Sequence, residues 1–336
     1  MPEWLTEYGN CTASFQSNWP GFPNENAMDR RSDDLPRLHD AFRALREALS
    51  AEIVGQAALI DRLLIALLAD GHLLVEGAPG LAKTSAIRAL AARLEADFAR
   101  VQFTPDLLPA DLTGTEVWRP QEGRFEFQPG PIFHPILLAD EINRAPAKVQ
   151  SALLEAMGER QVTVGRATYA LPALFLVMAT QNPIEQEGTY PLPEAQLDRF
   201  LLHVKIGFPD ASVERRILQQ ARGEAINGET APEHRVSQQA IFAARKEILG
   251  LYMADAVEEY LVQLIMATRT PAKYDAELAE WIAYGASPRG SISLDRCARA
   301  HAWLAGRDFV SPEDIQALLF GVLRHRLVLS FGAAAA

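Results

Sequence analysis

Apolar positions follow two different periods along the first two thirds of the chain. Leu38, Phe42, Leu45 and Leu49 recur at helical spacing. Beyond them, short uninterrupted apolar runs alternate with helical patterns, which predicts a parallel sheet with helices on both faces. The predicted strands are 72–76, 98–103, 136–140 and 174–180, and the helices between them include 84–94 and 147–157.

The pattern changes in the last third of the chain, where strand signals mostly stop. A late helix is predicted to begin at Ser311, because Ser311 can cap it and Asp314 completes a capping box. We therefore expect an α/β core at residues 35–208, followed by a smaller all-α lid domain at 209–336. The other predicted helices of the lid are 213–222, 237–249, 255–269 and 276–284.

Three segments depart from this organisation. Residues 1–34 are rich in Asn, Ser, Gly and Pro and show neither period. We expect a disordered tail there, or a non-native stretch if Met28 is the natural start. Residues 117–127 and 159–171 alternate like β-hairpins.

Composition narrows the function classes. The chain has 32 Lys and Arg against 43 Asp and Glu, a net charge of −11, which argues against a general nucleic-acid coat. The longest apolar runs are far shorter than the roughly 20 residues that cross a bilayer. Two cysteines and no visible secretory signal favour a cytoplasmic location. The scattered histidines predict no transition-metal site, and His325, between two arginines, is expected on a solvated helix face.

The strongest chemical signal is a glycine-rich loop between a predicted strand and a predicted helix. Such a loop cradles phosphate oxygens with its N–H groups, while Lys83 reaches the β- and γ-phosphates and Thr84 binds Mg²⁺. Alanine replaces the usual glycine at position 82, so we expect Ala82 to have a negative φ angle. A glycine-rich turn without a ligand is the alternative. The loop reads Gly77, Ala78, Pro79, Gly80, Leu81, Ala82, Lys83 and Thr84.

Two acids follow the apolar run 136–140. Asp140 is predicted to hold Mg²⁺, mostly through water, and Glu141 to orient and deprotonate an attacking water. Both fall at the carboxyl end of a strand, where ligands bind in open α/β sheets. Together with Lys83 they predict Mg²⁺-dependent nucleotide hydrolysis.

With these motifs in place, residues 35–331 resemble the MoxR family of AAA+ ATPases. The resemblance includes the alanine variant of the phosphate loop. It implies an AAA+ P-loop core followed by a helical lid, with ATP and Mg²⁺ as cofactors. Its other segments are QFTPDLLPAD at 102–111, LADEINRAP at 138–146, ATQNP at 179–183, EAQLDRF at 194–200 and GASPR at 285–289.

The resemblance implies roles for further residues of the core. Asn182 matches sensor 1, whose amide would orient the attacking water. Arg199 matches an arginine finger that would reach the γ-phosphate of a neighbouring subunit. Arg144 is the rival finger, and a surface ion pair between Arg199 and Asp198 is the simpler alternative.

The resemblance also assigns the lid and two insertions. Arg289 matches sensor 2, which would contact the γ-phosphate within its own subunit. Val54 and Gly55 resemble the stretch that packs on the adenine. Residues 106–133 match a helix-2 insert and 159–171 a pre-sensor-1 hairpin, although both segments could merely extend the sheet.

The function implied is ATP hydrolysis by a homo-oligomeric ring, a hexamer. Such a ring would act as a molecular chaperone that remodels or activates a client enzyme by metal or cofactor insertion. Its expected partner carries a von Willebrand factor A domain. The alternatives are a chelatase-type motor subunit and a DNA-acting translocase or nucleotide-gated switch, and the net negative charge weakens the DNA alternative.

Overall fold

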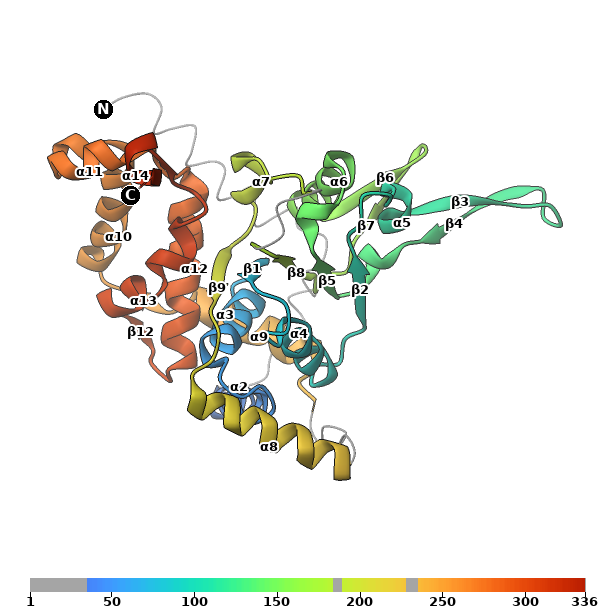
Figure 1. Cartoon of the computed structure of the whole chain (residues 1–336), viewed down its shortest axis with the longest axis horizontal. Coiled ribbons are helices and arrows are strands. Elements are labelled where there is room, and N and C mark those ends of the chain that lie inside the picture. Colours follow the sequence, from blue (N-terminus) through green and yellow to red (C-terminus); the bar gives the residue numbers. More distant parts are fainter. Residues whose placement is uncertain (1–34, 184–188, 228–234, 336) are drawn as a thin grey trace. The chain divides into compact units, whose positions relative to one another are not determined.

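A parallel sheet organises the computed structural model, which describes residues 35–183, 189–227 and 235–335. Five strands are hydrogen-bonded in the order β2-β5-β8-β1-β9, and every pairing is parallel (Figure 1). This confirms the predicted α/β core, although strand β9 carries no clear apolar run and was not predicted. The strands are β1 (Leu73–Gly77), β2 (Phe98–Gln102), β5 (Ile136–Asp140), β8 (Leu176–Gln181) and β9 (Leu202–Ile206).

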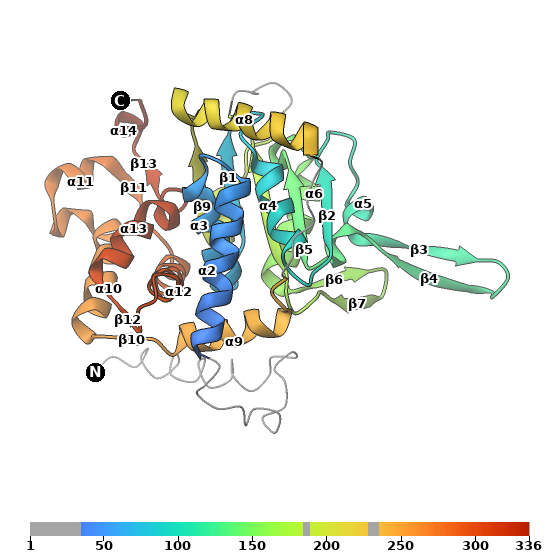
Figure 2. The ribbon, with the colours of Figure 1, turned by 90° about the horizontal axis from the view of Figure 1, so that it is seen from below.

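Helices cover both faces of the sheet, because alternate residues of a strand point to opposite faces. Leu73 and Val75 pack into one hydrophobic cluster together with α3 and α4, whereas Leu74 packs into a second cluster with α6. Figure 2 shows α2, α3 and α4 stacked along the first of these faces. The helices are α2 (Leu35–Glu52), α3 (Ala57–Leu68), α4 (Lys83–Ala92) and α6 (Ala147–Glu159).

The two predicted hairpins form separate two-stranded sheets, so the alternative that they extend the main sheet is wrong. Strand β3 (Gly114–Arg119) pairs with β4 (Arg124–Pro129) after the short helix α5 (Pro109–Thr113). Strand β6 (Gln161–Val164) pairs with β7 (Ala167–Ala170). The Phe127 ring of β4 stacks on the Tyr169 ring of β7, with centroids 3.9 Å apart, which ties the hairpins together.

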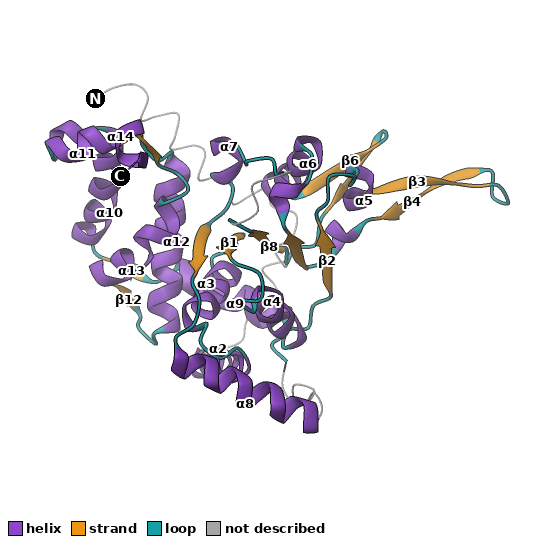
Figure 3. Cartoon of the chain, viewed as in Figure 1, coloured by secondary structure: helices purple, strands orange, loops and turns teal. Residues whose placement is uncertain are grey.

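The last third of the described chain is mainly helical, as predicted (Figure 3). The predicted helix 276–284 is wrong at its end, because residues 282–284 form β11 (Ile282–Tyr284), which pairs with β13 (Val328–Leu329). Two other residues form β10 (Tyr252–Met253), which pairs with β12 (Phe309–Val310). The helices are α8 (Ala211–Asn227), α9 (Gln238–Leu249), α10 (Asp255–Arg269), α11 (Ala276–Trp281), α12 (Pro288–Leu304), α13 (Pro312–Leu323) and α14 (Phe331–Ala335).

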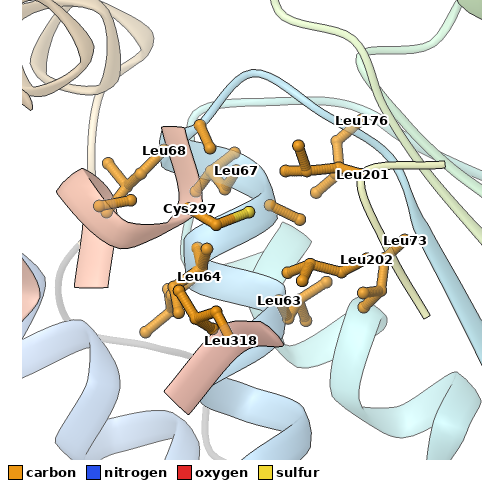
Figure 4. Close-up of a cluster of buried hydrophobic side chains, with 14 of the residues drawn as sticks. Leu63, Leu64, Leu67, Leu68, Leu73, Leu176, Leu201, Leu202, Cys297 and Leu318 are labelled. Atoms are coloured by element: carbon orange, nitrogen blue, oxygen red, sulfur yellow. The ribbon is translucent and has the colours of Figure 1, made fainter. Parts of the chain in front are cut away.

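Helices α12 and α13 share a hydrophobic core with the sheet. Helix α3 is apolar along most of its length because it contacts β1 and β9 as well as α9 and α12. Figure 4 shows Cys297 of α12 and Leu318 of α13 packed against leucines of α3, such as Leu64. Burial raises the pKa of the Cys297 thiol to about 12, so Cys297 serves as a packing residue.

The remaining short elements connect these layers. No helix within the described ranges is long and apolar enough to cross a membrane. The tail at 1–34, and with it the question of Met28, lies outside the described residues. The connecting elements are the short helix α7 (Glu194–Leu197) and the 3-10 turns η2 (Pro131–Phe133), η3 (Ile142–Arg144) and η4 (Pro271–Lys273).

Candidate functional site

The glycine-rich loop lies between β1 and α4, as the sequence predicted. Gly80 has a φ angle of +81°, and no atom lies within 4 Å of the position that a Cβ would take there. The Lys83 ammonium donates to the Gly77 carbonyl at 2.5 Å, so it lies against the loop. The loop therefore combines open space, a lysine and the N-terminus of a helix, and this arrangement fits a phosphate group.

Ala82 differs from its prediction. Its φ angle is +57°, in the left-handed region, whereas a negative angle was expected for an alanine. The chain turns at this residue, immediately before the first residue of α4. A left-handed conformation costs a non-glycine residue about 1–2 kcal/mol. The Ala82 methyl packs against the main hydrophobic cluster, which helps to hold this conformation.

Asp140 ends β5, and residues from both neighbouring strands hold its carboxylate. The Thr180 hydroxyl of β8 donates to Oδ1 of Asp140 at 2.6 Å and accepts the Glu141 N–H at 2.9 Å. Arg100 of β2 donates to Oδ2 of Asp140 at 2.7 Å. No local pattern of the sequence points to Arg100 or Thr180, because only the strand order β2-β5-β8 places them beside Asp140.

Glu141 lies one residue beyond the strand, also with a positive φ angle, +57°. Its carboxylate accepts a hydrogen bond from the Gln102 amide at 2.8 Å and lies 3.3 Å from the Arg144 guanidinium. Strained backbone of this kind concentrates at functional sites. Gln102 belongs to the segment 102–111 but had no predicted role, and together with Arg144 it holds the Glu141 carboxylate.

Asn182 is buried at the end of β8, with 4% of its surface exposed. It lines a cavity of about 370 Å³ together with Glu76, Asn143 and Gln181. The His203 imidazole, whose Nε2 lies 3.1 Å from a Glu76 carboxylate oxygen, lowers the pKa of Glu76 against the opposing effect of burial, and Lys205 lowers it further. Since β8 pairs with both β5 and β1, its end lies between the two acids and the phosphate loop.

Arg289 and Arg199 have different surroundings. Arg289 lies in the first turn of α12, where its N–H donates to the Ser287 hydroxyl, and its guanidinium lies 3.5 Å from Asp198. Arg199 donates to the carbonyl of Leu154 in α6. Asp198 pairs with lid arginines, so the alternative of a surface pair between Asp198 and Arg199 is wrong.

The predicted solvated face at His325 is also wrong. Only 6% of His325 is exposed, and its Nε2 lies 3.0 Å from the carbonyl oxygen of Phe200. Burial lowers the pKa of His325 well below its usual value, and the charge of Arg326 adds to this effect. The local sequence, three basic residues in a row, concealed that the turn after α13 packs against the segment before β9.

Val54 and Gly55 lie in the turn between α2 and α3. Gly55 has a φ angle of +81°, and a Cβ at this residue would lie 2.2 Å from Cγ1 of Val213 in α8. The close approach that glycine permits is therefore to helix α8.

This packing predicts that Gly55→Ala lowers the free energy of unfolding by about 2–4 kcal/mol, from backbone strain and overpacking together. Denaturant unfolding of the full chain measures it. Gly223→Ala is the matched control, because Gly223 lies inside α8 with no atom near its missing Cβ. That variant should be neutral or up to about 1 kcal/mol more stable. Equal stabilities of the two variants would contradict the prediction.

Comparisons with known proteins agree with this geometry. Residues 72–202 match the ATPase family associated with various cellular activities, and residues 276–336 match an AAA lid domain. The chain is 44% identical to "Chaperone MoxR1" of Mycobacterium tuberculosis over 89% of this chain and 78% of that protein. It is 37% identical to "Protein MoxR" of Paracoccus denitrificans over 87% of this chain and 90% of that protein.

A solved structure agrees with the fold. The crystal structure of a candidate ATPase from Cytophaga hutchinsonii superposes with a TM-score of 0.84 at 44% identity. The superposition covers 90% of this chain and 92% of that one. Fold, phosphate loop and relatives lead to one assignment: the chain belongs to the MoxR family of AAA+ ATPases and is an ATP hydrolase.

Proposed function

We propose that this chain is a ring-forming chaperone that hydrolyses ATP at the carboxyl edge of its parallel sheet. The observation that carries the proposal is the convergence of three elements at that edge. The open phosphate loop with Lys83 follows β1, the acids Asp140 and Glu141 follow β5, and Asn182 follows β8. Strand order brings them together although they are far apart along the chain.

The loop from Gly77 to Thr84 would bind the phosphates of ATP. Thr84 and Asp140 would hold Mg²⁺, which when bound neutralises phosphate charge. Glu141 would take a proton from the attacking water. Gln102 and Arg144 hold the Glu141 carboxylate at the strand edge, where it can meet a water in line with the γ-phosphate.

The remaining residues would complete the site from three directions. Asn182 would orient the attacking water, and Arg289 would contact the γ-phosphate from the lid. Val54 and Gly55 would line the adenine. Domain boundaries after residues 34 and 208 remain our proposal, supported by a main sheet that ends at Ile206 and a lid helix that begins at Ala211.

Arg199 would act on the ATP of a neighbouring subunit in a homo-oligomeric ring, which we propose to be a hexamer. The family suggests such rings. Arg144 is the weaker candidate for the finger, because its guanidinium lies 3.3 Å from Glu141 of the same chain and supports that carboxylate. A guanidinium supplied across an interface makes hydrolysis depend on assembly.

Chaperone activity is supported by the name of the relative MoxR1. We propose a client enzyme activated by metal or cofactor insertion, a partner with a von Willebrand factor A domain, and a cytoplasmic location. Relatives that match most of the chain carry the MoxR name, which favours this proposal over a chelatase subunit or a DNA translocase.

The test is the ATPase rate per subunit, measured against protein concentration with Mg²⁺ and without a partner. We expect the rate per subunit to rise with concentration, because each site needs a neighbour. A rate that does not vary with concentration over the range in which the chain assembles would contradict a site completed in trans. If the chain assembles but does not hydrolyse ATP, the proposal that the ring hydrolyses ATP without a partner is wrong.

A further inference from the structure

A lid arginine holds the segment that carries Arg199. Arg326 follows α13 and has 8% of its surface exposed. Its Nε donates to Oδ1 of Asp198 at 2.9 Å, and its Nη2 donates to the carbonyl of Phe200 at 2.6 Å. Asp198 and Phe200 flank Arg199. One planar, rigid guanidinium therefore restrains the backbone on both sides of Arg199.

The Asp198 carboxylate has further partners in the lid. Its Oδ2 accepts the Ser287 hydroxyl at 2.9 Å, and the Arg289 guanidinium lies 3.5 Å from the same oxygen. The two arginines differ in burial, since the Arg326 side chain is 1% exposed and the Arg289 side chain 58% exposed. Arg326 is thus the fixed partner of Asp198, and Arg289 is a loose partner that can leave.

We propose that Asp198 and Arg326 are positioning residues that couple the nucleotide contact of Arg289 to the placement of Arg199. The inference rests on the proposed function, in which Arg289 reads the γ-phosphate of its own subunit and Arg199 acts on the next one. When Arg289 turns to its own nucleotide, Asp198 keeps only its contacts with Arg326 and Ser287. The restraint on the segment carrying Arg199 then changes, and with it the position of Arg199 at the ATP site of the neighbouring subunit.

The carboxylate charge is the essential part of this device. Asp198 is largely buried, with 16% of its side chain exposed, and it compensates the buried charge of Arg326. Removing one partner of such a pair leaves the other charge buried and uncompensated. Asp198→Asn keeps the shape of the side chain while removing its charge, so it perturbs the coupling with little change in volume.

The experiment uses mixed rings of two full-length variants. Glu141→Gln subunits keep Arg199 but lack the catalytic base, whereas Arg199→Ala subunits keep the base but lack the finger. Hydrolysis in the mixture arises at the ATP site of an Arg199→Ala subunit, which keeps Glu141, when the neighbour that supplies Arg199 is a Glu141→Gln subunit. Asp198→Asn is then added to one partner or to the other, and kcat and KM of the mixture are measured.

In the Glu141→Gln partner, which donates the finger, Asp198→Asn should lower kcat about 10- to 100-fold, because a small misplacement of a catalytic group has an effect of this size. In the Arg199→Ala partner it should leave kcat nearly unchanged and lower KM for ATP, because Asp198 no longer competes for Arg289. Equal losses of kcat in both placements would show a purely structural role and overturn the inference.

Two further variants keep the result interpretable. Asp295→Asn removes the ion pair of 2.8 Å between Asp295 and Arg299 within α12. It should leave kcat and KM of the mixture unchanged, whichever partner carries it. Arg326→Lys keeps the charge but loses the planar fork, so it should act only in the finger-donating partner. Thermal unfolding of each variant checks its fold.

The parental mixture separates this inference from the proposed function. If Glu141→Gln and Arg199→Ala subunits give no hydrolysis when mixed, the site completed in trans fails and the inference fails with it. If the parental mixture is active but Asp198→Asn has the same effect on kcat in either partner, the site completed in trans stands and only the coupling is overturned.

Discussion

Glu141→Gln is expected to lower the rate of ATP hydrolysis by about 10²–10⁴-fold, the contribution of a positioned general base. The amide keeps the size of the carboxylate but cannot accept the proton of an attacking water. Affinity for ATP should be kept, because the phosphate loop and Lys83 are untouched. Phosphate release under saturating ATP measures the rate, and equilibrium binding of ATP measures the affinity.

The control is Glu47→Gln on α2, an exposed carboxylate that is none of the residues proposed for the site. It should hydrolyse ATP at the wild-type rate. Hydrolysis by Glu141→Gln at a rate within a few-fold of wild type, with binding intact, would assign the base to another residue. Loss of ATP binding in Glu141→Gln would instead mean that Glu141 is needed to bind ATP and not only for the chemical step.

Arg199→Ala is expected to lower kcat by about 10³–10⁵-fold, the range measured for arginine fingers in phosphoryl transfer. As a finger, the Arg199 guanidinium would stabilise charge that develops on the transferring phosphoryl group, so ATP binding should change far less than kcat. Single-turnover hydrolysis in assembled rings measures the effect. Gel filtration shows whether the ring persists, which separates lost chemistry from lost assembly.

Arg144→Ala and Arg215→Ala complete this series. Arg144 lies beside Glu141, and its removal should reduce kcat by less than the removal of Arg199, since Gln102 still holds the carboxylate. Arg215 is exposed on α8 and serves as the matched control, with wild-type kcat expected. A larger loss in Arg144→Ala than in Arg199→Ala would identify Arg144 as the finger.

Local patterns of the chain predicted four of the five strands of the main sheet, with their carboxyl ends placed to within one residue. Strand β5 was predicted at its observed residues because its uninterrupted apolar run is typical of a parallel strand buried on both faces. The capping box at Ser311 likewise placed the start of α13. The phosphate loop was identified because its glycines and its lysine lie within one short segment.

Other features depend on contacts between distant segments, and no local pattern contains them. Ala82 is left-handed because the turn into α4 and its packing outweigh the preference of alanine. Residues 282–284 leave their helical pattern because they pair with β13. His325 looked solvated among basic neighbours, yet it is buried where the turn after α13 meets the segment before β9.

The chemistry of the site divides in the same way. The sequence alone predicted which residues would bind phosphate and activate water, because these roles depend on residue type and near spacing. Only the tertiary structure decided what holds those residues: Arg100 and Thr180 on Asp140, Gln102 on Glu141. These contacts arise from strand order, which brings together residues distant in the chain and which local periodicity does not specify.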